Sequence, residues 1–309
     1  MQRIFNLLGP VSFFLLLGYV AYDQSAKREE PPQVPDLEPI QIEESWKPIV
    51  AVSYDLPAEV SFAGEPVPLN VSDVYERLDK ELQINVYLHS STLFLLKRAN
   101  RWFPQMEEIL KANDIPSDFK YLPLIESALL NATSPKDAVG YWQILESSGK
   151  ELGLEITKEV DERYDPIKST EAACKYLKKA YKKFGNWTLV AASYNRGVGG
   201  VSREMENQQV DNYYDIHMND ETSRYVFRLL AIKEIFENPD KYGFKLKPAH
   251  LYQPESLKQV EVNETIKDLV VFAKSQGANY KLLKRHNPWL RQNRLTVKKG
   301  RKYQIALPS

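Results

Sequence analysis

Cysteine is almost absent from this sequence of 309 residues, which contains only Cys174. A single cysteine excludes an intramolecular disulfide. Its neighbours follow a helical pattern of alanine and leucine, which favours the role of a small buried hydrophobe over that of a reactive thiol. No cysteine closely follows the apolar segment at the N-terminus, so we expect no lipoprotein attachment site.

The sequence also lacks an excess of charge and a cluster of histidines. Lys plus Arg and Asp plus Glu each number 41, which gives no electrostatic reason to expect a nucleic-acid partner. Four histidines are scattered without metal-ligand spacing: His89, His217, His250 and His286. The glycines of 197–200 follow a helical pattern rather than a strand, so they do not form a dinucleotide-binding loop. We therefore expect no metal, no cofactor and no nucleic acid.

A long apolar run occurs at the N-terminus, where residues 4–22 follow Arg3. Its length reaches the ~17–25 residues needed to span a bilayer. It is either a cleaved signal sequence or an uncleaved anchor, because a buried core helix is not expected beside a polar linker. We assign 1–23 to this signal or anchor helix and 24–70 to a proline-rich linker with an extended segment. The following residues are expected to be exported, with membrane association if the helix is uncleaved.

Residues 71–247 have the pattern of an all-α domain with short connections. Val86, Leu93 and Leu96 recur at helical spacing, and a separate helix is predicted from about Pro104 to Asn113. These helices have the composition of core-facing elements, so we expect one helical domain here.

Helix boundary signals are clear in the second half of this domain. Asp165 followed by a proline predicts a helix start, and Gly185 predicts its end. Asn186 is a suitable cap for the next helix. A further helix is predicted over Thr222–Phe236.

Residues 258–309 have a different pattern, which indicates a small βααβ unit. The predicted elements are an extended piece around Val260 and Val262, helices over Ile266–Ala273 and Tyr280–Asn287, and a closing strand within Leu295–Ile305. The predicted fold is therefore mainly α, with a helical domain followed by a small βααβ domain.

Glu126 stands out because it lies in an apolar run at the end of a predicted helix, between Tyr121 and Ala128. Loss of solvation disfavours a charged carboxylate and raises its pKa. A raised pKa suits a general acid that acts near neutral pH. Such a glutamate is more often a partnered structural carboxylate, so this segment alone leaves both interpretations open.

Three further segments accompany this glutamate: Ser134-Pro135-Lys136-Asp137-Ala138-Val139-Gly140-Tyr141-Trp142-Gln143, Ala191-Ala192-Ser193-Tyr194-Asn195-Arg196-Gly197 and Glu221-Thr222-Ser223-Arg224-Tyr225-Val226. In this order and spacing they resemble the lytic transglycosylases of the goose-lysozyme-like superfamily, and within it the membrane-bound lytic transglycosylase D type. The resemblance covers roughly residues 110–245, and the combination of four parts is highly specific. It implies a lysozyme-like helical catalytic domain.

The resemblance also implies roles for individual residues. Glu126 would be the catalytic acid and base. The expected substrate-binding residues are Ser127, Ser134, Gln143, Tyr194, Asn195 and Tyr225. Ser127 would support the site, Ser134 would lie near the N-acetyl group of the cleaved sugar, and Gln143 would lie beside the scissile bond. Tyr194 and Asn195 would shape the pocket, and Tyr225 would lie near the reacting centre. Tyr141 stands where the family usually has leucine, and we expect this change to alter packing only.

The C-terminal unit resembles a LysM module, which is a peptidoglycan-binding βααβ fold. The matching positions include Phe272-Ala273, Asn287-Pro288 and Gly300. Asn263-Glu264 replaces the usual Gly-Asp, which bears on ligand affinity more than on the fold. The alternative is a small structural appendage without a glycan ligand.

Together these resemblances imply a lytic transglycosylase of the periplasm or cell envelope, whose partner is the glycan strand of peptidoglycan. The enzyme would cleave the bond between N-acetylmuramic acid (MurNAc) and N-acetylglucosamine (GlcNAc) and leave 1,6-anhydro-MurNAc ends. Because the motifs supply one carboxylate, the 2-acetamido group of the substrate would assist. Two alternatives remain open: a muramidase-type hydrolase of the same fold, and a non-catalytic protein that binds the cell wall.

Overall fold

The computed structural model describes residues 51–309. The predicted signal or anchor helix of residues 1–23 lies outside this range, as does most of the linker assigned to 24–70. Within the described range no helix is both long and apolar enough to pass through a membrane. Helices predominate there, and the strands form two small sheets. The predicted fold class is confirmed: a mainly α region followed by a small βααβ unit.

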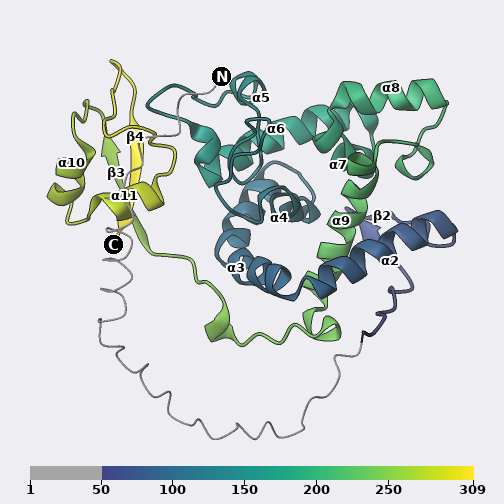
Figure 1. Cartoon of the computed structure of the whole chain (residues 1–309). Coiled ribbons are helices and arrows are strands. Elements are labelled where there is room, and N and C mark those ends of the chain that lie inside the picture. The colour runs from purple at the N-terminus through teal and green to yellow at the C-terminus, as the bar shows by residue number, and fades with distance from the viewer. Residues whose placement is uncertain (1–50) are drawn as a thin grey trace, which may run out of the picture. The chain divides into compact units, whose positions relative to one another are not determined.

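The helical region contains eight α-helices, which are labelled in Figure 1. They are α2 (Ser72–Tyr87), α3 (His89–Ala112), α4 (Leu122–Ser127), α5 (Glu146–Glu151), α6 (Pro166–Phe184), α7 (Trp187–Arg196), α8 (Val198–Gln208) and α9 (Asp220–Glu237). Short 3-10 helices cover Ser117–Tyr121, Glu162–Tyr164, Tyr213–Asp215, Pro239–Tyr242 and Pro248–His250. A small hairpin, β1 (Ser61–Phe62) with β2 (Glu65–Pro66), precedes α2.

Five of these helices form a closed ring. Contacts join α2 to α3, α3 to α6, α6 to α7, α7 to α9, and α9 back to α2. In the projection of Figure 1 the short helix α4 lies inside this ring, and it packs directly on α9. The helix that carries Glu126 is therefore held against α9, one of the ring helices.

Small side chains allow α6 and α7 to pack closely within the ring. Ala172, Ala173 and Ala180 of α6 are buried, as are Ala191 and Ala192 of α7. Cys174 is also fully buried in this layer, which confirms its predicted role as a small hydrophobe.

Both predicted ends of α6 and the predicted start of α7 are confirmed, whereas α9 begins at Asp220, two residues before the predicted Thr222. Asp165 accepts the backbone N–H groups of Ile167 and Lys168, and Gly185 ends α6 in the left-handed region at φ 63°. Asn186 caps α7 by accepting the N–H of Leu189 at 2.8 Å. Side-chain oxygens thus satisfy N–H groups that a helix start leaves without partners.

The prediction of a separate helix beginning near Pro104 is wrong. Pro104 lies inside α3, which is continuous from His89 to Ala112. Proline removes one backbone hydrogen bond and disfavours a helical residue before it. Buried side chains on both sides of the proline, such as Leu96 and Met106, hold α3 together across this position.

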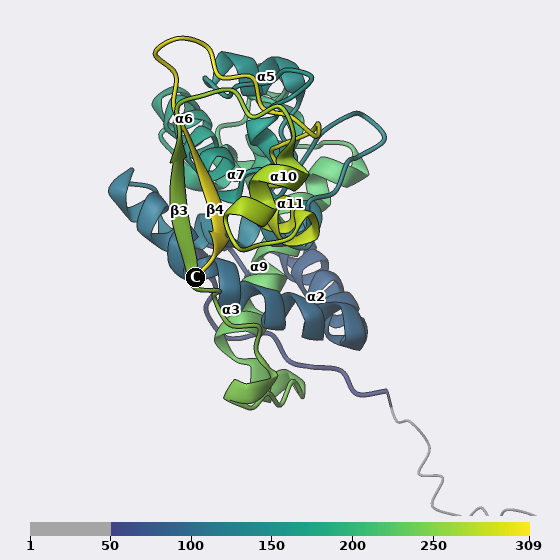
Figure 2. The same cartoon turned by 90° about the vertical axis from the view of Figure 1, so that its left-hand side faces the viewer.

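The C-terminal unit consists of β3 (Leu257–Val262), α10 (Leu269–Ser275), α11 (Tyr280–His286) and β4 (Tyr303–Pro308). Figure 2 shows β3 and β4 side by side as an antiparallel pair, in which Val260 faces Ile305. Both helices contribute to one small core with β4, through Leu269, Leu283 and Ile305. This order confirms the predicted βααβ arrangement.

The first helix of this unit is shorter than predicted. It begins after Asp268, which caps it by accepting the N–H groups of Val270 and Val271. Ile266 is not helical because it forms an isolated antiparallel bridge with Leu295. The apolar run that begins at Ile266 is therefore divided between a bridge and a helix.

Candidate active site

Helix α4 presents Glu126 in its last turn, and the chain after it is tightly fixed. Ala128 and Leu129 are both left-handed, at φ 54° and 55°. The N–H of Ala128 bonds to the carbonyl of Leu124 at 3.0 Å, and that of Leu129 to Pro123 at 3.2 Å. These bonds end α4 directly after the glutamate and fix the direction of its side chain.

The carboxylate of Glu126 is only partly accessible. Burial raises its pKa from the ordinary value of 4.5 to about 7. A hydrogen bond from the Tyr225 hydroxyl to Oε1 and the positive charge of Arg228 oppose this increase, and the negative charge of Glu221 adds to it. Glu126 therefore exchanges protons near neutral pH, which is the property expected of a general acid and base.

Two tyrosines surround this carboxylate from neighbouring ring helices. Tyr225 of α9 is buried and donates its hydroxyl to Glu126. Tyr194 of α7 donates its hydroxyl to the carbonyl of Trp142 at 2.8 Å. Burial and then the charge of Glu126 raise the pKa of both phenols far above the usual value. Both hydroxyls consequently remain protonated donors at physiological pH.

Asn195 links α7 to α9 at the edge of the site. Its Nδ2 donates to Glu221 Oε1 at 2.9 Å, and its Oδ1 accepts the Thr222 hydroxyl at 2.8 Å. Asn195 thus holds Glu221, whose negative charge raises the pKa of Glu126. Its described contacts are with α9 rather than with Glu126 itself.

The last residue of α4 and the loop that follows it carry the remaining predicted site residues. Ser127 donates its hydroxyl to Pro123 O at 3.1 Å and to Tyr141 O at 2.8 Å, and so ties α4 to this loop. Gln143 is left-handed at φ 47°, and its Nε2 donates to Gly140 O at 2.8 Å. Ser134 Oγ accepts the N–H of Ala138 at 3.0 Å. The structure therefore places Ser134 and Gln143 as folding groups of one loop.

Trp142 and Arg163 anchor the loop that follows α4 through buried hydrogen bonds. The indole of Trp142 is fully buried and donates to the Thr170 hydroxyl of α6 at 2.8 Å. The guanidinium of Arg163 donates to the carbonyls of Asp137 at 3.1 Å and Ile144 at 3.2 Å, at two separate points of the loop. Asp161 pairs with this buried guanidinium at 2.8 Å. A buried charge pair with satisfied hydrogen bonds fixes the loop geometry.

Gly140 is required where the loop crosses Arg163. A Cβ atom on Gly140 would lie 2.1 Å from the carbonyl oxygen of Arg163, and Gly140 has φ +81°. Any L-residue would meet both a clash and an unfavourable backbone conformation.

The sequence interpretation assigned no role to four charged residues of this region, although Glu221 begins one of the four motifs. Glu221 and Arg228 share a face of α9 with Tyr225, because positions 221, 225 and 228 have i, i+4 and i+7 spacing. That periodicity was the sequence signal that could have placed Glu221 and Arg228 beside Tyr225. Asp161 and Arg163 gave no such signal, because two charged residues in a loop normally indicate a solvated surface.

Metal-binding geometry is not found in the described part of the chain. No group of three His, Cys, Asp or Glu side chains between residues 51 and 309 is arranged to hold a metal ion.

Comparison with known proteins finds two matching domain families. Residues 105–216 match the family model of the transglycosylase SLT domain. Residues 258–309 match the model of the soluble lytic transglycosylase C-terminal LysM-like domain. These matches confirm the resemblance inferred from the motifs.

Two curated relatives match part of the chain. Membrane-bound lytic murein transglycosylase D of Escherichia coli strain K12 is 31% identical over 195 residues, which cover 60% of this chain and 42% of that protein. A putative tributyltin chloride resistance protein of Alteromonas sp. strain M-1 is 32% identical over 124 residues, which cover 40% of this chain and 60% of that protein. The chain thus spans less than two thirds of either relative.

Two solved structures are also similar. The 70 kDa soluble lytic transglycosylase of Escherichia coli is 21% identical with a TM-score of 0.39, covering 49% of this chain and 26% of that one. An inactive mutant of the lytic transglycosylase Slt of Pseudomonas aeruginosa is 19% identical with a TM-score of 0.36. The match covers 50% of this chain and 26% of that one. Two parts of the chain are thus similar to known domain families: one part to the transglycosylase SLT domain and the C-terminal part to the LysM-like domain of soluble lytic transglycosylases.

Proposed function

We propose that this protein is a peptidoglycan lytic transglycosylase that uses Glu126 first as an acid and then as a base. The observation that carries the proposal is the state of this carboxylate: partly buried, with a pKa of about 7, and bonded to Tyr225 through Oε1. The match of residues 105–216 to the transglycosylase SLT domain supports the reaction class.

In the first step, protonated Glu126 gives its proton to the glycosidic oxygen between MurNAc and GlcNAc. No described residue hydrogen-bonds to Oε2 of Glu126, so this oxygen is available to the substrate. The bond from the anomeric carbon to the leaving oxygen breaks, and the oxygen of the muramic 2-acetamido group forms a bond to that carbon. The product of this step is an oxazolinium and an ionised Glu126.

The second step returns the proton. Ionised Glu126 accepts the proton of the C6 hydroxyl of the same sugar, whose oxygen attacks the anomeric carbon and displaces the acetamido oxygen. This closes the 1,6-anhydro ring without water. The Tyr225 hydroxyl and the Arg228 charge favour ionised Glu126, so they stabilise the enzyme between the two steps.

The substrate would lie against the loop that follows α4. We assign Ser134 and Gln143 to the acetamido side of the cleaved sugar, with Ser127 as support for α4. Tyr194 and Asn195 keep the pocket in shape, because each bonds across to a neighbouring segment. Ser134 and Gln143 thus each have one role in folding the loop and one proposed role toward the sugar.

The domain boundaries and the location of the enzyme belong to the same proposal. We assign residues 71–247 to catalysis and 258–309 to peptidoglycan binding. The substrate requires the periplasm or cell envelope, to which the apolar residues 4–22 would deliver the chain as a cleaved signal or as a membrane anchor.

The products of digestion test this function. Purified sacculi are treated with the wild type, with Glu126→Gln, and with Glu206→Gln, which changes an exposed glutamate of α8 as a matched control. Mass spectrometry should detect 1,6-anhydromuropeptides from the wild type and the control, and none from Glu126→Gln. Reducing-end muramic acid in place of the anhydro sugar would identify a hydrolase, and unchanged sacculi in all three samples would identify a non-catalytic wall-binding protein.

A further inference from the structure

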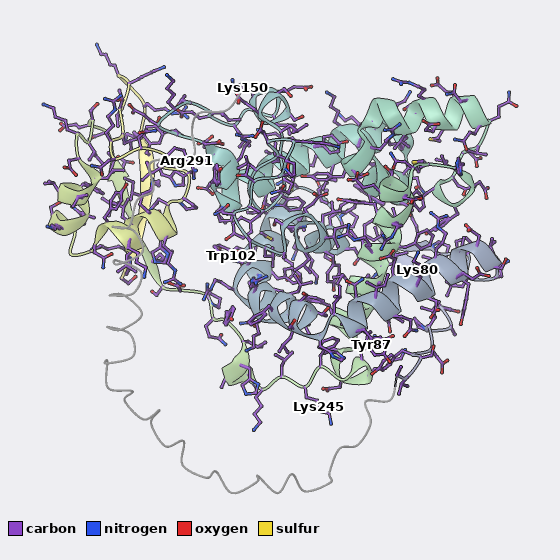
Figure 3. The ribbon with its side chains drawn as sticks, in the orientation of Figure 1. Lys80, Tyr87, Trp102, Lys150, Lys245 and Arg291 are labelled. Atoms are coloured by element: carbon purple, nitrogen blue, oxygen red, sulfur yellow. The ribbon has the colours of Figure 1, made fainter. Side chains whose placement is uncertain are left out.

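A hollow whose walls do not include Glu126 lies where the helical region meets the C-terminal unit. It has a volume of about 740 Å³, which is in the range of small-ligand pockets. Its walls come from α3, from the chain after α4, from the start of α6, and from β3, α11 and β4. Trp102, which Figure 3 labels on α3, is one of the wall residues.

The hollow exists because the C-terminal unit is bonded directly to the helical region. Val160 forms an antiparallel bridge with Leu290 and belongs to the small core of the C-terminal unit. Next to it, the N–H of Asp161 bonds to Trp289 O at 2.9 Å. The Arg291 guanidinium, labelled in Figure 3, lies 3.7 Å above the ring of Tyr164. The helical region and the C-terminal unit are thus held together by backbone pairing as well as by side chains.

Positive charge predominates on these walls. Three acidic residues, Glu162, Asp165 and Glu255, face six cationic ones: Arg98, Arg101, Lys168, Arg285, Arg301 and Lys302. Two of the acids are already engaged by backbone N–H groups, since Asp165 caps α6 and Glu162 accepts the N–H of Glu155 at 2.7 Å. The third, Glu255, is shared between Arg285 and Arg101.

Two of the cations, Lys168 and Arg98, form no ion pair of 4 Å or less within residues 51–309. The Lys168 side chain is exposed, and the Asp165 carboxylate on the same wall attracts it without a direct ion pair. The Arg98 guanidinium donates only to the neutral carbonyl of Ala128, at 3.0 Å. A carboxylate that entered the hollow would therefore meet cations that are not already paired.

Aromatic rings line the same space. Trp102 and Tyr141 contact each other edge to face at 5.1 Å, and Trp289 and Tyr303 stack at 5.7 Å. Tyr252 lies beneath the Arg101 guanidinium at 5.6 Å. Rings beside unpaired cations suit a ligand that has both apolar surface and carboxylates.

The wall of this hollow is continuous with the helix that carries Glu126. Ser127, the next residue, donates to Tyr141 O at 2.8 Å, and Arg98 holds Ala128 O. Tyr141 and Arg98 are both wall residues. An occupant would therefore contact two residues that fix the end of α4, Arg98 through its side chain and Tyr141 through its backbone carbonyl.

We propose that this hollow binds the carboxylate-bearing peptide stem of peptidoglycan. The inference rests on the proposed function, which supplies peptidoglycan as the substrate. The stem is favoured over the glycan backbone because the lactyl carboxyl of muramic acid is consumed in the amide bond to the stem. The free carboxylates of the polymer are thus on the peptide.

Calorimetry on the full chain tests this site with two probes, a free stem tetrapeptide and a peptide-free chitooligosaccharide. Lys168→Glu reverses the unpaired charge, and Lys182→Glu makes the same change at the other end of α6, where the lysine is also exposed. We expect Lys168→Glu to weaken tetrapeptide binding by roughly five- to thirty-fold and Lys182→Glu to leave it unchanged. Trp102→Ala should also weaken it, with thermal melting as the check on folding.

Three results would overturn the site: no tetrapeptide binding by the wild type, equal effects of the two lysine changes, or displacement of the tetrapeptide by the chitooligosaccharide. The proposed function is tested separately by the anhydromuropeptide assay. Anhydro products without tetrapeptide binding would refute this site alone, and tetrapeptide binding without anhydro products would refute the proposed reaction alone.

Discussion

Removing the hydroxyl of Tyr225 should raise the pKa of Glu126 and lower the maximum rate at the same time. The hydroxyl donates to Oε1, so it stabilises the ionised carboxylate and holds its pKa down against the effect of burial. In Tyr225→Phe this contribution disappears, while burial and the negative charge of Glu221 remain. The pKa must then rise above the value of about 7 in the wild type.

The size of the change follows from the strength of the lost bond. Hydrogen bonds to charged groups contribute about 1.5–3 kcal/mol, and 1.36 kcal/mol corresponds to one pKa unit. Because Glu126 is partly accessible, water would replace some of the lost interaction, so we expect a rise of about one unit. The alkaline limb of kcat/KM should move upward by the same amount. The maximum kcat should fall roughly tenfold, because the ionised carboxylate between the two steps is less stabilised.

The measurement is the release of soluble muropeptides from sacculi across the pH range from 5 to 10. Tyr213→Phe is the matched control, because the buried Tyr213 also donates its hydroxyl near α9, to Ser223 O at 2.7 Å, but not to Glu126. Its alkaline limb should coincide with that of the wild type. The reasoning is falsified if the alkaline limb of the kcat/KM profile of Tyr225→Phe coincides with that of the wild type or lies at lower pH.

Three further changes test the stability of the site. Glu126→Gln should raise the free energy of unfolding above pH 7 by up to about 3 kcal/mol in urea titrations. The pKa of Glu126 in the folded state is about 7 and its ordinary value is 4.5, so the wild type loses stability as the pH rises between these two values. Equal free energies of unfolding for the two proteins at pH 8 would contradict this. Arg163→Leu should destabilise by about 3–5 kcal/mol, since it leaves buried Asp161 unpaired, and a drop in Tm of less than one degree would argue against it. Gly140→Ala should lower the free energy of unfolding, measured by urea titration, by at least about 2 kcal/mol, because the new Cβ would clash with Arg163 O. Gly199→Ala is the control and should not lower this free energy, because the space around Gly199 is open.

The parts of the fold that the sequence predicted correctly are those with local signals. Asp165 and Gly185 mark the two ends of α6, and Asn186 marks the start of α7, because capping depends on neighbouring residues alone. The raised pKa of Glu126 followed from the apolar run around it, which is also a local property. The roles of the loop residues toward a sugar stay predictions.

The parts that could not be predicted depend on contacts between distant segments. Pro104 is a local signal for a helix boundary, but packing of α3 against other elements overrides it. Arg163 has the sequence context of a surface residue, and only the folded loop shows that its guanidinium is buried between two carbonyls. Single-sequence patterns do not contain such pairings.

Val160 has a consequence for how the protein is dissected. It is 2% exposed, and it is part of the core formed by Leu290 and Leu295 rather than of its own helical region. A truncation before residue 258 would leave this valine in water and open the backbone pairing next to Asp161. Separate expression of the last 52 residues would leave a gap in their core where the valine belongs. Truncated variants that divide the chain before residue 258 therefore damage both halves, and a loss of activity in such variants is not a measure of glycan binding.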